Sequence, residues 1–308
     1  MQPVGSIECA PNLVDAAIDP VEWATTRERE GWPVLAAADH LWDTTRAYAH
    51  WAVTLTQFAM CTTAPRITSS FANNLLRSPV EFAQAALSLQ RASGGRFEAG
   101  LGAGWAADEI IGIGLPYPSA AERAGRYAES MHVVRALLRD GRCTFSGDFV
   151  RVDVPSIAPM VPVPPPLVAS VGGPRTIREV VPLVDRVELK LSSAATRGGR
   201  LDIEQLATVD LDHLKSLVHQ VRALRPDVPL GVFVMVGCGD HPRVAGLREV
   251  LAGTLMGSLI GEPEQVADVV RSFAALSIER VQLTPYSPDT LALLAPHLTD
   301  PYVPGVGN

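Results

Sequence analysis

An aspartate, a histidine and a tryptophan, Asp39, His40 and Trp42, stand just past the apolar run Pro33–Ala38. An imidazole with an ordinary pKa of about 6.5 gives or takes a proton at neutral pH, or hydrogen-bonds a carbonyl or hydroxyl. In a parallel barrel the C-terminal strand ends form the active face, so this position favours a functional role. The alternative is a structural rim histidine, with Asp39 bonding a nearby backbone N–H. Position alone leaves both interpretations open.

Glycines follow another apolar run in Gly100-Leu101-Gly102-Ala103-Gly104-Trp105. From Gly102 to Ala107 the spacing matches G-x-G-x-x-A, a dinucleotide fingerprint in which backbone N–H groups approach a pyrophosphate. That fold also needs an acid at the end of a second strand about 20 residues on, whereas Glu122 belongs to a helix start. The sequence therefore favours glycines that let a flat ligand or a neighbouring loop come close.

The third strand candidate is unusually polar for the inside of a barrel, because Ser69 and Ser70 precede Phe71 and Asn73. Buried hydroxyls and amides need hydrogen-bond partners, and a ligand in the barrel mouth would provide them. The alternative is that the asparagines simply form a turn.

Two glycines, Gly172 and Gly173, precede a helix start, with Arg175 and Thr176 close behind. Exposed amides at a helix N-terminus make an anion site. Alone, a Gly-Gly helix entry is common, so this segment is only a candidate phosphate cradle.

Sequence motifs for several other chemistries are missing. There is no G-x-x-x-x-G-K-[ST], H-E-x-x-H or G-x-S-x-G, and the seven histidines do not cluster as zinc ligands. The four cysteines are far apart and indicate reduced thiols rather than disulfides or a metal site. A polar, glycine-lined barrel mouth with one acid–base group suits a phosphate-bearing cofactor that performs the chemistry itself.

Eight β-rich apolar runs alternate with helical patterns, which is typical of repeated βα units around a parallel sheet. Two stretches interrupt the alternation, Arg142–Pro165 after the fourth helix and Ser192–Asp210 after the sixth strand. No composition change marks a domain boundary. The sequence predicts one α/β domain over residues 1–308, a (β/α)8 TIM barrel with two excursions. The strand candidates are Ser6–Cys9, Pro33–Ala38, Arg66–Phe71, Arg96–Gly102, Pro166–Val171, Asp185–Lys190, Pro229–Val236 and Glu279–Thr284.

Several helix boundaries carry chemical signals. Ser78 precedes a proline at a first helical position, and Ser119 with Glu122 forms a capping box before a helix that Gly141 can close. The segment His50–Thr62 is apolar on almost every side. It would suit a helix that covers the barrel and faces another subunit, or equally a helix buried within the monomer.

Charge and composition limit the partners. The chain of 308 residues has a net charge of −7, with 24 arginines against two lysines, Lys190 and Lys215. It has no apolar run near the roughly 18 residues that a membrane span requires. Nucleic acid and membranes are therefore not expected as partners. The N-terminus lacks the pattern of a secretory signal, and we expect a soluble cytoplasmic protein.

In order along the chain, several segments resemble those of the luciferase-like monooxygenases and coenzyme F420-dependent oxidoreductases. The resemblance extends from about Val21 to Leu298. The segments that carry it are Ala38–His40, Asn73–Pro79, Leu87–Phe97, Gly100–Trp105 with Glu109, Gly114–Pro116, Arg123, Phe145–Gly147, Gly172–Gly173 and Gly261–Val266.

The resemblance implies a barrel that is usually a dimer, with a flavin or deazaflavin ring at its C-terminal mouth and the phosphate near the Gly-Gly turn. In deazaflavin members a non-proline cis peptide supports the ring, and Ser70–Phe71 occupies that position. His40 is the implied catalytic residue, with Trp42, Trp105 and Glu109 in the substrate pocket and no metal. With the patterns above, the expected cofactor contacts are Asp39, Ser69, Ser70, Phe71, Asn73, Gly102, Gly104, Gly172, Gly173, Arg175 and Thr176.

The expected activity is hydride transfer between coenzyme F420 and a small organic substrate, reducing an activated C=C, C=N or C=O with His40 as proton donor. The first alternative is an FMN-dependent monooxygenase that uses oxygen and is supplied by a separate flavin reductase; an F420 reductase would do the same for the deazaflavin. The second is a flavin-binding barrel without catalysis. Family members that oxidise a sugar phosphate carry a glutamate where Trp105 stands and a set of lysines, so two lysines argue against that substrate.

Overall fold

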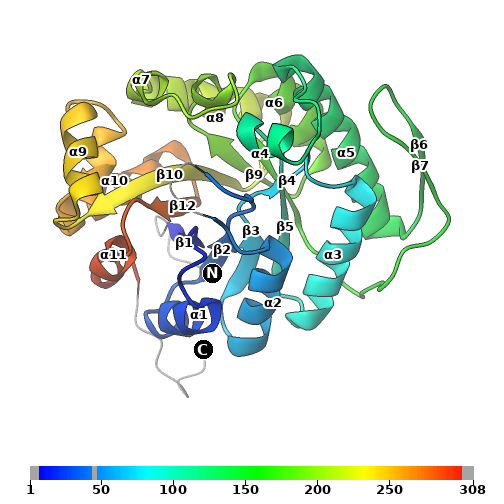
Figure 1. Ribbon diagram of the computed structural model, residues 1–308, viewed down its shortest axis with the longest axis horizontal. Coiled ribbons are helices and arrows are strands. Elements are labelled where there is room, and N and C mark those ends of the chain that lie inside the picture. Colours follow the sequence, from blue (N-terminus) through cyan, green and yellow to red (C-terminus); the bar gives the residue numbers. More distant parts are fainter. Residues whose placement is uncertain (1–6, 44–46, 300–308) are drawn as a thin grey trace.

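The structure is a computed structural model that describes residues 7–43 and 47–299. Within these residues eight parallel strands form a closed barrel with helices around it (Figure 1). β12 pairs with β1, and β9 with β10, so the series of strands is closed. The barrel strands, in spatial order, are β1 (Glu8–Leu13), β2 (Val34–Ala37), β3 (Arg66–Ser69), β5 (Phe97–Gly102), β8 (Leu167–Val171), β9 (Arg186–Lys190), β10 (Leu230–Cys238) and β12 (Arg280–Pro285).

The predicted TIM barrel is thus confirmed, and seven of its strands overlap their predicted ranges closely. The first strand differs: we predicted Ser6–Cys9, whereas β1 runs from Glu8 to Leu13 and pairs with β12 and β2. Glu8 places a charge in this segment, which is unusual for a strand inside a barrel. In the folded barrel its carboxylate accepts hydrogen bonds from Arg66 and Arg280, so the charge is compensated inside the sheet.

Helices connect successive barrel strands and pack against their outer faces. Ser119 and Glu122 form the predicted capping box at the start of α5, and Gly141 ends that helix with a positive φ of 69°. Ser78 caps α3 through the Glu81 N–H. The helices are α1 (Pro20–Arg29), α2 (Trp51–Cys61), α3 (Pro79–Ala92), α4 (Ala107–Gly112), α5 (Ala120–Asp140), α6 (Pro174–Val180), α8 (Leu211–Leu224), α9 (Pro242–Val250), α10 (Pro263–Ser272) and α11 (Thr290–Leu298). None within the described residues is long and apolar enough to cross a membrane.

The two excursions have different surroundings. The first contains the antiparallel hairpin β6 (Cys143–Ser146) and β7 (Arg151–Val154), which lies beyond α5 at the right of Figure 1. The Glu129 carboxylate of α5 accepts three backbone N–H groups at the hairpin turn. The second contains α7 (Ile203–Ala207) and lies over the C-terminal mouth of the barrel, where it lines a cavity.

Helix α2 has two distinct sides. Trp51, Leu55 and Phe58 are fully buried within the monomer. Val53 and Met60 are 59% and 73% exposed. The apolar character of this helix is therefore only partly explained by packing against the barrel.

Charged side chains fill the N-terminal end of the barrel interior, where branched apolar residues are usual. Arg280 is fully buried and donates to Glu98 at 2.5 and 2.9 Å. Glu188 lies further along the interior, 3.7 Å from Arg280, and neither of its oxygens receives a hydrogen bond from the described residues. Burial raises the pKa of Glu188 to about 7, against the lowering effect of the Arg280 and Arg186 charges.

Candidate active site

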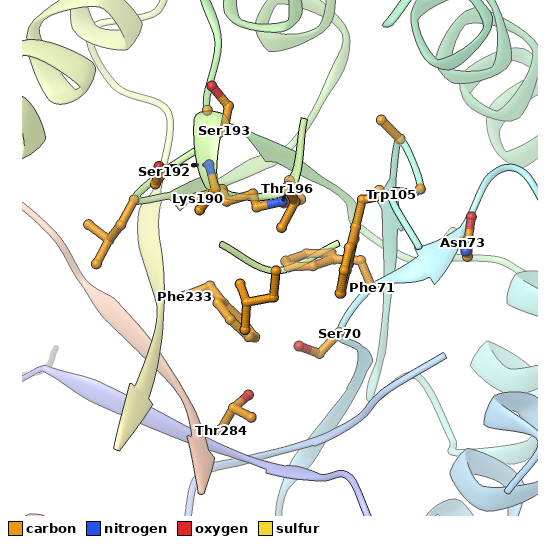
Figure 2. A pocket seen from close by; sticks show the side chains of 18 of the residues that line it. Ser70, Phe71, Asn73, Trp105, Lys190, Ser192, Ser193, Thr196, Phe233 and Thr284 are labelled. Atoms are coloured by element: carbon orange, nitrogen blue, oxygen red, sulfur yellow. Dashed lines mark hydrogen bonds between the residues drawn. The ribbon is translucent and has the colours of Figure 1, made fainter. Parts of the chain in front are cut away.

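A cavity of about 620 Å³ opens at the C-terminal ends of the barrel strands, a size typical of small-molecule sites. Figure 2 shows side chains from several strand ends pointing into it. Twelve residues predicted for the site line this cavity, whereas Ser69, Trp42 and Glu109 do not. The twelve are Asp39, His40, Ser70, Phe71, Asn73, Gly102, Gly104, Trp105, Gly172, Gly173, Arg175 and Thr176.

His40 lies in the cavity wall, and a buried carboxylate holds its ring. His40 Nδ1 hydrogen-bonds Glu109 Oε1, and Glu109 Oε2 accepts the Leu41 N–H at 2.8 Å. A carboxylate on Nδ1 fixes the tautomer and orientation of an imidazole, which leaves Nε2 for a ligand. Nε2 has no hydrogen-bond partner among the described residues.

Glu109 therefore has a different place from the one predicted. It is 1% exposed and lies behind His40 rather than in the substrate pocket. This pairing could not be predicted from the sequence, because the two residues are 69 positions apart and Glu109 lies in the short helix α4.

The tryptophans of the predicted pocket have separate locations. Trp105 lines the cavity, with its ring in edge contact with the His40 ring at a centroid distance of 5.5 Å. Trp42 is 38% exposed and packs against Gly112 of α4, where an added Cβ would lie 2.6 Å from the indole. Trp42 consequently does not line the cavity, and its assignment to the pocket is corrected.

The Asp39 carboxylate organises the loop that follows β3. It accepts the Asn73 N–H at 2.6 Å and pairs with the Arg77 guanidinium through both of its oxygens. The bond to the Asn73 N–H agrees with the structural alternative for Asp39, a bond to a nearby backbone N–H. Asp39 is 5% exposed, so only a small part of it reaches the cavity.

The end of β3 passes very close to β5. The Ser70–Phe71 peptide is cis, as the family resemblance implies. An added Cβ at Gly100 would lie 2.1 Å from the Ser69 carbonyl oxygen, and one at Gly102 would lie 3.1 Å from Phe71 Cβ. Gly100 and Gly102 thus allow a neighbouring segment to come close. This agrees with the alternative to the dinucleotide fingerprint.

Ser69 is a second correction among the predicted cofactor contacts. Its side chain is fully buried, and its hydroxyl donates to the Gly100 carbonyl at 2.6 Å. It is therefore not available to a ligand in the cavity. The neighbouring Ser70 hydroxyl does line the cavity and is held by Gln282 and Asn12.

The two glycines after β8 differ in what surrounds them. A Cβ at Gly172 would lie 2.6 Å from the Lys190 carbonyl oxygen, so packing alone demands glycine there. A Cβ at Gly173 would meet nothing closer than the Ser193 hydroxyl at 3.7 Å and the Thr176 hydroxyl at 4.0 Å. Packing does not demand glycine at 173, and the space beside it, with two hydroxyls, fits a phosphate group.

Arg175 does not offer a free charge to that space. Its guanidinium binds Glu179, one turn on in α6, and the Ala121 carbonyl. The hydroxyl of Thr176 donates to the Gly173 carbonyl at 3.0 Å. A phosphate here would therefore depend on hydroxyl and backbone groups rather than on the arginine.

Sequence reasoning missed Lys190, which ends β9 and lines the cavity. Its ammonium donates to the Thr196 hydroxyl and lies 5.9 Å from the centre of the Trp105 ring. Burial lowers the pKa of Lys190 to about 8, with a further lowering by the charge of Arg123. Its place at the C-terminal end of a predicted strand was a signal that could have identified it.

A family model described as luciferase-like monooxygenase matches residues 11–202. An F420-dependent glucose-6-phosphate dehydrogenase from Amycolatopsis mediterranei is 30% identical over 160 residues, which are 51% of this chain and 48% of that protein. The chain thus spans about half the length of the curated relatives it matches.

Two solved structures share the fold over nearly their whole length. An F420-dependent secondary alcohol dehydrogenase in complex with an F420-acetone adduct has a TM-score of 0.74 at 17% identity, covering 96% of this chain and 98% of that one. The coenzyme F420-dependent tetrahydromethanopterin reductase from Methanopyrus kandleri has a TM-score of 0.71 at 14% identity, with coverage of 96% and 98%. With the family model matching more than half of its residues, the chain belongs to the luciferase-like monooxygenase family.

Proposed function

We propose that the protein is a coenzyme F420-dependent oxidoreductase that reduces an activated C=C, C=N or C=O bond of a small organic substrate. The observation that carries this proposal is His40, whose Nδ1 is held by the buried Glu109 while Nε2 is left for the cavity. The names of the curated relatives, all F420-dependent dehydrogenases, support the deazaflavin over FMN.

The residues that would hold the cofactor come from two sides of the cavity. The Ser70–Phe71 backbone would support the ring, and the space beside Gly173, with the Thr176 and Ser193 hydroxyls, would take the phosphate. When bound, reduced F420 supplies a hydride from C5 of its deazaflavin ring. Because it carries hydride and reacts poorly with oxygen, it suits reduction rather than oxygenation.

His40 completes the reduction with a proton. For a carbonyl substrate, His40 Nε2 would donate its proton to the carbonyl oxygen, while the reduced cofactor would supply the hydride that the carbonyl carbon takes up. Glu109 stabilises the imidazolium before this transfer and keeps the ring aimed at the cavity. The indole of Trp105, in edge contact with His40, excludes water from one side of the reacting group.

Anaerobic turnover tests the proposal. Purified protein is mixed with reduced F420 and a panel of ketones, aldehydes, imines and enones, and the return of the oxidised deazaflavin absorbance is followed. We expect at least one class to oxidise the cofactor in wild type and not in His40→Ala. The contradicting result is no turnover of reduced F420 by any panel member, together with oxygen-dependent turnover of reduced FMN in a parallel aerobic assay. That result would favour the monooxygenase.

A further inference from the structure

Lys190 is one of two lysines in the chain, and the barrel directs it inward. Side chains alternate along a strand, so Arg186, Glu188 and Lys190 of β9 share the inner face. Arg186 and Glu188 belong to the charged interior, whereas Lys190 is the last of the three and reaches the cavity. Figure 2 shows its ammonium pointing along the cavity toward Thr196 and Trp105.

The Lys190 ammonium has no carboxylate partner among the described residues; its hydrogen bond goes to the neutral Thr196 hydroxyl. Lys190 is half-buried. An ammonium that is shielded from water without a counter-charge is unfavourable, and such groups are normally paired. The charge that affects the pKa of Lys190 is that of Arg123 in α5, which is also positive.

Several other charged groups in the wall have partners within the protein, whereas Arg197 and Arg243 also line the cavity but are exposed to solvent. Asp39 pairs with Arg77, Arg175 with Glu179, and His40 with Glu109. The Arg123 guanidinium donates to the carbonyls of Pro118 and Arg197 and stacks on the Tyr117 ring. Among the described cations that line the cavity, Lys190 is therefore one that is shielded from solvent and donates to a neutral hydroxyl rather than to a carboxylate.

From this geometry we propose that Lys190 binds a carboxylate group of the substrate while His40 serves the bond that is reduced. The inference rests on the proposed function and adds the substrate class, an organic acid. Both residues lie beside the Trp105 ring. Its centroid is 5.5 Å from that of the His40 ring and 5.9 Å from Lys190 Nζ, so one small molecule lying along this indole reaches both.

A carboxylate fits Lys190 better than a phosphate. One ammonium and one hydroxyl, from Lys190 and Thr196, match the single charge and two oxygens of a carboxylate. A phosphate dianion would favour a second cation beside Lys190. The Arg123 N–H groups are already engaged with carbonyls, and Arg197 and Arg243 of the same cavity are exposed to solvent. A bound carboxylate would also supply the negative counter-charge that Lys190 lacks among the described residues.

Ligand binding by calorimetry tests this assignment without turnover. The probes are phenylacetate, its uncharged analogue phenylacetamide, and phenyl phosphate, each titrated at pH 7 into cofactor-free and F420-loaded protein. In wild type we expect phenylacetate to bind at least about tenfold more tightly than the amide. Lys190→Met and Lys190→Gln should both lose this preference, whereas Lys215→Met, which removes the other lysine on the surface of α8, should keep it.

Several results would overturn the assignment. These are equal affinity for acid and amide in wild type, no measurable binding of either, a preference that survives in both Lys190 variants, or tighter binding of phenyl phosphate than of phenylacetate. Weaker F420 binding by the Lys190 variants with the acid preference intact would assign the lysine to the cofactor instead. The cofactor-free titrations keep the test valid even if F420 does not bind, so this failure is distinguishable from failure of the proposed function.

Discussion

At the level of single residues, the contact between His40 and Glu109 decides which nitrogen of the imidazole meets the cavity. Glu109 Oε1 hydrogen-bonds Nδ1, and Glu109 Oε2 accepts a hydrogen bond from the Leu41 N–H. The carboxylate is almost fully buried, so its orientation of the ring does not depend on solvent. His40 is thus held in position for proton transfer before any ligand enters.

Replacing His40 by Ala should lower turnover about 100-fold or more, because a positioned acid–base group contributes about that much. Affinity for F420 should be unchanged, since His40 serves the substrate. Glu109→Gln should give a smaller loss, because the amide still contacts Nδ1 without stabilising an imidazolium. Steady-state kinetics with a cofactor titration measure both effects, with the exposed His213→Ala in α8 as control. Full activity of His40→Ala would restrict this residue to a structural role.

Gly173 gives a second prediction at this scale. A methyl group there meets no protein atom closer than 3.7 Å, so Gly173→Ala should fold normally. It would occupy the space assigned to the phosphate, and we expect the F420 Kd to rise about tenfold, equivalent to about 1.4 kcal/mol. The control is Gly246→Ala in α9, where the added methyl also meets nothing within 4 Å. Equal F420 affinity in both variants would place the phosphate elsewhere.

The single residues that sequence could identify were those at strand ends. His40, Ser70 and Gly173 were predicted because they lie at or just past the C-terminal ends of strand candidates, at the active face of a barrel. Ser69 was wrongly included, since sequence does not reveal which of two neighbouring serines points inward to a ligand and which bonds the next strand.

At the level of elements, the cavity depends on where each helix begins. Helix α5 starts at the capping box of Ser119 and Glu122, and its first turns bring Ala120, Ala121 and Arg123 to the cavity wall. The cap was readable from sequence because it is a local pattern of four residues. Its consequence for the cavity was not, because it requires the packing of α5 against the barrel.

Ser119→Ala tests the contribution of this cap. Loss of the hydroxyl removes the bond to the Glu122 N–H, and the free energy of unfolding should fall by about 1 kcal/mol. Urea denaturation measures the change, with Ser216→Ala on the exposed face of α8 as control. If Ser119→Ala is as stable as that control, the box does not stabilise α5.

At the scale of the whole molecule, the barrel was predictable and its charged interior was not. Apolar strand patterns and helix caps are local features of the sequence, and they predicted the alternation of eight βα units. The pairing of Arg280 with Glu8 and Glu98 joins positions up to 272 residues apart and forms only when β12 meets β1. The same closure explains why β1 was poorly predicted, because its charged residue is compensated by the last strand.

The buried Glu188 makes stability depend on pH. Its pKa rises from an ordinary 4.5 to about 7, so the folded protein holds this proton more firmly than the unfolded chain. The contribution of this group to stability therefore falls as pH rises from 4.5 to about 7 and is constant above it. Glu188→Gln should raise the Tm relative to wild type more at pH 8 than at pH 5. A difference in Tm that does not change with pH would contradict this.

We propose that this barrel mouth binds coenzyme F420, and a direct binding titration tests this most directly. Purified protein is titrated with oxidised F420 and, separately, with oxidised FMN, and the change in cofactor fluorescence gives each Kd. We predict a micromolar Kd for F420 and binding of FMN that is at least about tenfold weaker. Micromolar binding of FMN with no binding of F420 would contradict the claim, and binding of neither would indicate a barrel that has lost its cofactor.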